Sequence, residues 1–159
     1  ADALARLAQQ VREAQRCATP LVIAGGGSKS FLLEPLAGEV LDMRAYRGVL
    51  AYEPAELVIE VRAGTPLLEV ETLLAAHGQC LASEPPRPES ASTIGGAVAA
   101  GFSGPARPWA GALRDHVLGV GLISPAGDLL RFGGRVMKNV AGYDVSRLVT
   151  GAWGTFGPI

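Results

Sequence analysis

Apolar residues recur with a helical period at the beginning of the chain. Leu4, Leu7 and Val11 lie three or four residues apart, and most positions between them are polar or alanine. This spacing places the apolar side chains on one face and predicts an amphipathic helix over residues 3–16. The helix is expected to end before Pro20, because a residue that precedes proline avoids helical geometry.

Short apolar runs bounded by turn residues predict strands in the next part of the chain. The runs 21–23 and 40–42 each predict one buried strand. The runs 49–52 and 57–62 predict a pair of strands joined by a turn at 53–54.

A second helix is predicted after this pair. We expect Thr65 to cap its N-terminus and Pro66 to occupy its first position, because these residue types favour those places. Its apolar pattern continues to about Ala76, and Gly78 then provides a helix stop.

The second half of the chain is richer in glycine and small residues. Ser92 or Thr93 is expected to cap a short helix of small residues, and a glycine-rich loop is expected over 102–111. Residues 117–124 and 128–132 predict a hairpin around Pro125, Ala126 and Gly127, and residues 144–149 predict a short helix. The prolines at 85–88 interrupt regular structure between the halves.

These elements predict an α+β fold in one domain over residues 1–159, with two small lobes that separate near 85–88. The length of 159 residues and the 48% hydrophobic content are sufficient for a packed core. The net charge of -1 gives no electrostatic reason to expect binding of nucleic acid or of an anionic membrane. No apolar run approaches the ~20 residues that cross a bilayer, so a cytoplasmic protein is expected.

The two cysteines and two histidines do not predict a metal site or a catalytic cluster. Cys17 and Cys80 are expected to be free thiols, because a chain without a signal peptide predicts a reducing compartment, and a single disulfide between them is the alternative. None of these residues has the spacing of a metal site.

The stretch 24–30, AGGGSKS, follows the predicted strand 21–23 and contains three consecutive glycines. It lacks the glycine before lysine that a P-loop requires, so an NTPase is disfavoured. It also lacks the long following helix of a dinucleotide-binding βαβ unit, because Pro35 interrupts it. The remaining interpretation is a loop whose exposed backbone N–H groups bind an anion. A simple turn without a ligand is the alternative.

A second glycine-rich stretch, Thr93-Ile94-Gly95-Gly96, opens the predicted small-residue helix. The N-terminus of such a helix attracts anions, although close packing on a neighbour would also explain the small residues. Two possible anion sites in one small domain suggest a ligand with two phosphates. A side chain introduced at Gly26 or Gly95 is expected to fill the space between backbone and ligand.

Together these stretches resemble the PCMH-type FAD-binding domain of the vanillyl-alcohol-oxidase-like flavoproteins. The similarity continues through Arg114-Asp115-His116-Val117, through 133–144 and through Gly151-Ala152-Trp153-Gly154-Thr155-Phe156-Gly157. Within the family, the most similar branch is that of the FAD-binding E subunits of bacterial glycolate oxidase (glycolate dehydrogenase). This resemblance implies that FAD lies between the two lobes.

The resemblance also implies which residues bind FAD. The first glycine loop and the Thr93 segment are expected on either side of the pyrophosphate, Val117 and Ile159 near the adenine, and Lys138 and Asn139 at the flavin rim. The implied cofactor-binding residues are Gly25, Gly26, Gly27, Ser28, Lys29, Pro86, Thr93, Ile94, Gly95, Gly96, Gly101, Ser103, Gly104, Gly111, Arg114, Asp115, Val117 and Ile159.

The first loop offers no histidine or cysteine, so FAD is expected to be bound non-covalently. The chain stops where the C-terminal substrate or cap domain of the family would begin, and the catalytic residues are therefore not assigned. The resemblance implies a redox subunit of a 2-hydroxy acid oxidase complex that includes a catalytic flavoprotein subunit and an iron–sulfur subunit. A flavin-free structural subunit is the alternative. Partners would also provide any attachment to the inner face of the cell membrane.

Overall fold

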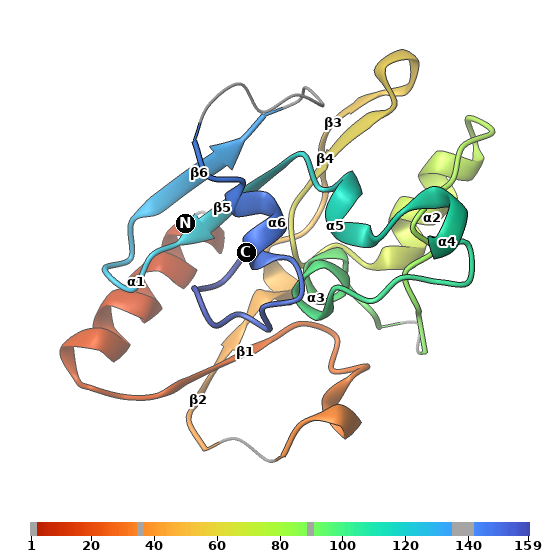
Figure 1. Ribbon diagram of the computed structural model, residues 1–159. Coiled ribbons are helices and arrows are strands. Elements are labelled where there is room, and N and C mark those ends of the chain that lie inside the picture. Colours follow the sequence, from red (N-terminus) through yellow and green to blue (C-terminus); the bar gives the residue numbers. More distant parts are fainter. Residues whose placement is uncertain (1–2, 35–36, 89–90, 135–141) are drawn as a thin grey trace.

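The computed structural model describes residues 3–34, 37–88, 91–134 and 142–159, and the chain combines short helices with two-stranded sheets (Figure 1). In chain order these elements are α1 (Ala3–Arg16), β1 (Leu21–Ala24), β2 (Glu39–Asp42), β3 (Val49–Glu53), β4 (Val58–Val61), α2 (Leu67–Ala75), α3 (Ile94–Ala100), α4 (Arg107–Ala110), α5 (Leu113–His116), β5 (Gly119–Ile123), β6 (Leu129–Gly133) and α6 (Val145–Val149). The predicted α+β class is confirmed.

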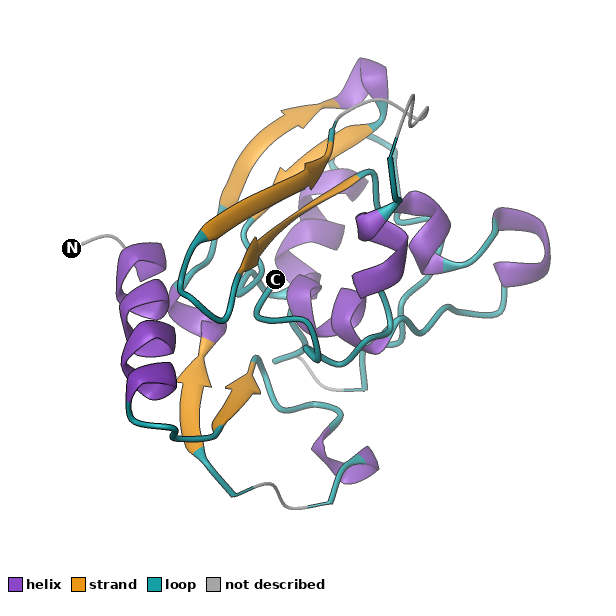
Figure 2. Ribbon diagram, turned by 60° about the vertical axis from the view of Figure 1, so that its left-hand side comes forward, coloured by secondary structure: helices purple, strands orange, loops and turns teal. Residues whose placement is uncertain are grey.

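Within the described ranges, the strands form three separate pairs. β1 and β2 are parallel, whereas β3–β4 and β5–β6 are antiparallel hairpins, as the sequence predicted for both hairpins. Figure 2 shows the β1–β2 pair set apart from the two hairpins, with α1 beside it. β1 ends directly before the first glycine loop, so the pairing of β1 with β2 holds the start of that loop.

Two groups of packed, buried side chains stand out in the core of the described part of the chain. The first group joins the buried face of α1 to β2 and also includes Ala63 and Ile123. Leu41 of β2 is completely buried in this group. The second group contains Val120, Leu122 and Val149, with Val117 and Ile159 packed against it. Ile123 of β5 therefore connects the C-terminal hairpin to the N-terminal core.

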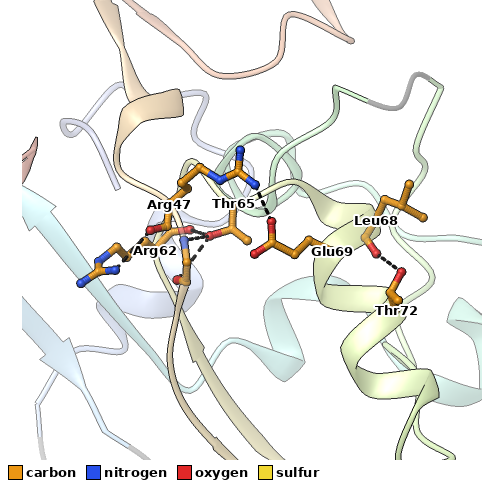
Figure 3. Close-up of polar contacts among 7 residues, drawn as sticks. Arg47, Arg62, Thr65, Leu68, Glu69 and Thr72 are labelled. Atoms are coloured by element: carbon orange, nitrogen blue, oxygen red, sulfur yellow. Dashed lines mark hydrogen bonds and ion pairs between the residues drawn. The ribbon is translucent and has the colours of Figure 1, made fainter.

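Thr65 does not cap α2, and that prediction is wrong. The helix begins at Leu67, after Pro66, and Thr65 is completely buried. Its hydroxyl accepts a hydrogen bond from the N–H of Gly48 at 2.8 Å and donates to the carbonyl of Arg62 at 2.7 Å (Figure 3). Thr65 thus connects the chain on either side of the β3–β4 hairpin.

Two further predictions were incomplete. The predicted loop 102–111 contains α4, whose first turn includes Pro108, a position where proline's missing N–H costs nothing. Arg114 and Asp115, for which the sequence predicted no helix or strand, belong to α5. Cys17 and Cys80 are both exposed and are not bonded to each other.

Candidate functional site

The first glycine loop lies directly against the segment that precedes α3. A Cβ atom placed on Gly26 would lie 1.6 Å from the carbonyl oxygen of Ala91, so only glycine fits there. Beside this contact, the buried hydroxyl of Ser92 donates a 2.8 Å hydrogen bond to the buried hydroxyl of Ser28. The structure therefore brings together the two glycine-rich stretches that the sequence singled out.

The backbone N–H groups of the loop are available to a ligand. In the described part of the chain, the N–H groups of Gly26, Gly27, Ser28 and Lys29 have no hydrogen-bond acceptor. Gly27 has a φ of +73°, a conformation that glycine adopts without strain. Successive free N–H groups in a tight loop form a concave site for an anion.

The N-terminus of α3 is different, because its N–H groups are already used. Ile94 donates to the carbonyl of Thr65 and Gly95 to the carbonyl of Ala63, both at 2.9 Å. Gly96 donates to the hydroxyl of Thr93, which caps the helix as predicted. This segment therefore contributes its shape to the site, while the free donors belong to the first loop.

The glycine at 95 serves packing within the protein. A Cβ atom at this position would lie 2.6 Å from the Cβ of Ala63 and 2.8 Å from its carbonyl oxygen. We predicted that a side chain at Gly26 or Gly95 would occupy the space between the backbone and the ligand, and the structure corrects this prediction. Both Cβ directions point at neighbouring parts of the chain, so the glycines shape the site indirectly.

Lys29 is a buried cation at the end of the loop. The residue is only 9% exposed, and no carboxylate in the described residues forms an ion pair with it. This burial lowers the pKa of the Lys29 ammonium below its ordinary value. An uncompensated buried charge is costly, and an anionic ligand beside it would remove part of that cost.

We expect Lys29 to make the stability of the ligand-free protein increase with pH. A lowered pKa in the folded state means that the unfolded chain binds more protons, so the free energy of unfolding rises from the folded-state pKa up to about 10.4. Lys29→Met should flatten this rise and stabilise the ligand-free protein by about 1 kcal/mol at neutral pH. Lys29→Arg should also flatten it, because arginine stays charged, but at a lower stability.

Urea unfolding between neutral pH and pH 10 measures these differences. A Lys29→Met protein with the same pH dependence as the wild type would show that another group causes the effect.

A small cavity opens beside the loop and the start of α3. Its volume is about 80 Å³. Five predicted residues contribute to its wall: Gly25, Thr93, Gly95, Gly96 and Ile159. The remaining wall residues are Ile23, Met43, Ala63, Ala99, Trp153, Gly154, Gly157 and Pro158. The cavity thus joins β1, α3 and the C-terminal segment 153–159.

None of these eight remaining wall residues was among the predicted cofactor-binding residues, and the missed ones include Ile23, Met43, Ala99 and Trp153. Met43 and Ala63 also belong to the first core group, so the core forms part of the cavity wall. The apolar runs in the sequence predicted strands and helices, but they did not indicate which of their side chains would line a cavity. The signal available in sequence was the position of Trp153 between the glycines of a recognised stretch.

Three predicted residues after α3 are engaged within the protein. Gly101 ends α3 with a φ of +68°. Ser103 accepts a hydrogen bond from the N–H of Leu113, and Gly104 donates to the carbonyl of Ser83. These bonds fix the path of the chain between α3 and α5.

The other predicted residues lie on the following segments. Gly111 ends α4 with a φ of +90°, Arg114 is exposed, and Asp115 accepts a hydrogen bond from the N–H of Ala112. Val117 packs against the second core group. The structure does not include these four residues in the cavity wall.

Pro86 is exposed and also lies outside the wall, whereas Lys138 and Asn139 lie outside the described residues. Among the described residues, no group of three or more His, Cys, Asp or Glu side chains could hold a metal ion. The helices in the described ranges include none that is long and apolar enough to cross a membrane.

Comparison with known proteins identifies the class to which this site belongs. The family described as "FAD binding domain" matches residues 2–133, which is more than half of the chain. The chain therefore belongs to this family of FAD-binding domains, and FAD is its cofactor.

The chain is 53% identical over 151 residues to glycolate oxidase subunit GlcE of Escherichia coli, covering 95% of this chain and 43% of that protein. It is 34% identical to glycolate oxidase subunit GlcD of Bacillus subtilis, covering 76% of this chain and 25% of the relative. It is 32% identical to the mitochondrial D-lactate dehydrogenase [cytochrome] of Arabidopsis thaliana, covering 88% of this chain and 24% of that protein. The chain thus spans less than half the length of each relative.

The fold is also similar to that of a solved alkyldihydroxyacetonephosphate synthase. The TM-score is 0.73 at 23% sequence identity, and the similarity covers 96% of this chain and 28% of the synthase. At this identity the similarity supports the shared fold.

Proposed function

We propose that this chain is the FAD-binding part of a redox subunit in a complex that oxidises glycolate or a related 2-hydroxy acid. The observation that carries the proposal is the first glycine loop: within the described residues, the N–H groups of Gly26 to Lys29 have no acceptor and the buried Lys29 has no carboxylate partner. The 53% identity to a glycolate oxidase subunit supports the choice of complex.

The residues around the cavity fit FAD. Free N–H groups and a buried ammonium are suited to a pyrophosphate, which carries two negative charges close together. The cavity wall contains no histidine or cysteine among its described residues, which supports non-covalent binding. When bound, the flavin of FAD supplies the ability to accept a hydride and pass electrons onward.

The protein's own residues would hold and orient the cofactor. The backbone of Gly26 to Lys29 would donate hydrogen bonds to the pyrophosphate, and Lys29 would provide its counter-charge. The hydrogen bond between Ser28 and Ser92 would keep the loop in the conformation that presents these donors. The apolar residues Ile23 and Met43 would exclude water from the enclosed part of the ligand.

The names of the relatives include two subunits of glycolate oxidase, which supports a multi-subunit assembly for this chain as well. We place a catalytic flavoprotein subunit and an iron–sulfur subunit in that assembly. Any attachment to the inner face of the cell membrane would then come through those partners. Co-purification of both subunits with the tagged protein tests this arrangement.

FAD should stabilise the protein and remain with it during purification. The purified protein should be yellow, and denaturation should release FAD, identified by chromatography. Added FAD at about a hundredfold excess over Kd should raise the free energy of unfolding by ~2.7 kcal/mol. FMN, which lacks the pyrophosphate and adenine, is the matched control and should have a much smaller effect.

A colourless protein that gains no stability from added FAD would contradict the proposal. If such a protein still co-purified with the other subunits, it would be a flavin-free structural subunit.

A further inference from the structure

Trp153 has an unusual backbone conformation at the edge of the cavity. Its φ is +53°, between Gly151 and Gly154, whose φ values are also positive. A bulky residue in this left-handed region is strained, and such residues are concentrated at ligand sites. The conformation is fixed by surrounding contacts, because the N–H of Trp153 donates to the carbonyl of Ala99 at 2.9 Å.

The indole ring of Trp153 is held in place but is only partly covered. Phe102 contacts it edge to face, with ring centroids 5.9 Å apart and an interplanar angle of 75°. Such a contact leaves at least one face of the indole free for another ring. Trp153 remains 40% exposed and, with Ile23, forms part of the cavity wall.

The position of this ring restricts which part of a ligand it can meet. Ile23 and Gly25 both belong to the wall, so the apolar side of the cavity adjoins the start of the loop with free N–H groups. A ligand there needs a flat apolar group connected to a phosphate by a short spacer. In FAD, adenine and isoalloxazine both satisfy this requirement, but a cavity of about 80 Å³ favours the smaller adenine over the three-ring flavin.

We propose that Trp153 is the stacking surface for the adenine of the cofactor and determines affinity for an adenine-containing ligand. This inference rests on the proposed FAD-binding function. It adds that Trp153 contacts the cofactor and that the contacted part is the adenine. Trp153 belongs to the cavity wall, and its edge-to-face contact with Phe102 limits the motion of the indole. Aromatic stacking of a base changes affinity by a factor of about ten.

Binding of ADP tests the proposal, because ADP contains adenine and pyrophosphate but no flavin. The chain has two tryptophans, and the other one, Trp109, is 87% exposed on α4 and outside the wall. In flavin-free Trp109→Phe protein, Trp153 is therefore the only tryptophan. ADP should quench its fluorescence in a saturable manner, whereas inorganic pyrophosphate, which lacks the ring, should bind without quenching.

Calorimetry with variants measures the contribution of the ring to affinity. Trp153→Leu should weaken ADP binding about tenfold and leave the affinity for inorganic pyrophosphate unchanged, whereas Trp153→Phe should retain most of the ADP affinity. Thermal unfolding of each variant shows whether it is folded. If the leucine variant does not fold, the fluorescence result and the phenylalanine variant decide the question.

The outcomes separate this inference from the proposed function. Unchanged ADP affinity in folded Trp153→Leu, or absence of quenching by bound ADP, overturns the role of Trp153 while wild-type FAD binding stands. If wild-type protein binds neither ADP nor FAD, the proposed function and this inference both fail.

Discussion

Replacement of Gly26 by valine should remove FAD from the protein almost completely. The Cβ position at Gly26 lies 1.6 Å from the carbonyl oxygen of Ala91, so the loop must move away from the α3 segment. This movement would break the adjacent hydrogen bond between Ser28 and Ser92 and displace the free N–H groups. We expect more than a tenfold loss of FAD affinity, measured as flavin content after gel filtration and by titration with FAD.

Gly27 provides the matched control one residue away. No heavy atom lies within 4 Å of its Cβ position, so alanine there meets only the strain of a positive φ, about 1–2 kcal/mol. Gly27→Ala should therefore bind FAD more tightly than Gly26→Ala. Equal flavin content in the two alanine variants would show that contact with Ala91 does not shape the loop.

The sequence allowed the two glycine stretches to be found but did not show how they meet. Three consecutive glycines at 25–27 imply that another group approaches the backbone closely. The resemblance suggested that this group was the pyrophosphate of the cofactor. The structure shows that the Cβ direction of Gly26 points at Ala91, 65 positions later in the chain. A contact between such distant segments depends on tertiary packing, which local sequence patterns do not specify.

Truncation of Leu41 to alanine should cause the largest loss of stability among simple core substitutions near the site. Leu41 is completely buried in the first core group, next to residues that include Met43 and Ala63 of the cavity wall. A buried leucine replaced by alanine costs about 3 kcal/mol. This is a large fraction of the ~5–15 kcal/mol that holds a typical domain folded. Chemical unfolding of the flavin-free protein measures the change.

Leu57 is the matched control for this substitution, because it is 79% exposed at the end of the β3–β4 hairpin. Leu57→Ala should change the free energy of unfolding by less than about 0.5 kcal/mol. Saturating FAD should restore part of the stability lost in Leu41→Ala. A Leu41→Ala protein as stable as Leu57→Ala would contradict the assignment of Leu41 to the core.

The predictions for helices and strands were most accurate where local patterns dominate. The apolar face of 3–16 and the cap at Thr93 depend on neighbouring residues, and both are present. Thr65 satisfied the same local rule but is not a cap, because hydrogen bonds to Gly48 and Arg62 compete for its hydroxyl. The glycines around Trp153 drew attention to its segment, but its place in the cavity wall depends on Ile23 and α3, which are distant in sequence.

The contact between Gly26 and Ala91 also has a consequence for the order of events during synthesis. Residues 25–29 leave the ribosome well before residues 91–92, whose contacts define the loop. A nascent chain that ends before α3 therefore lacks the partner that fixes the loop, and long-range contacts of this kind form late. Cofactor loading should begin only after α3 has emerged, so a ribosome-bound chain of 1–85 should not retain FAD.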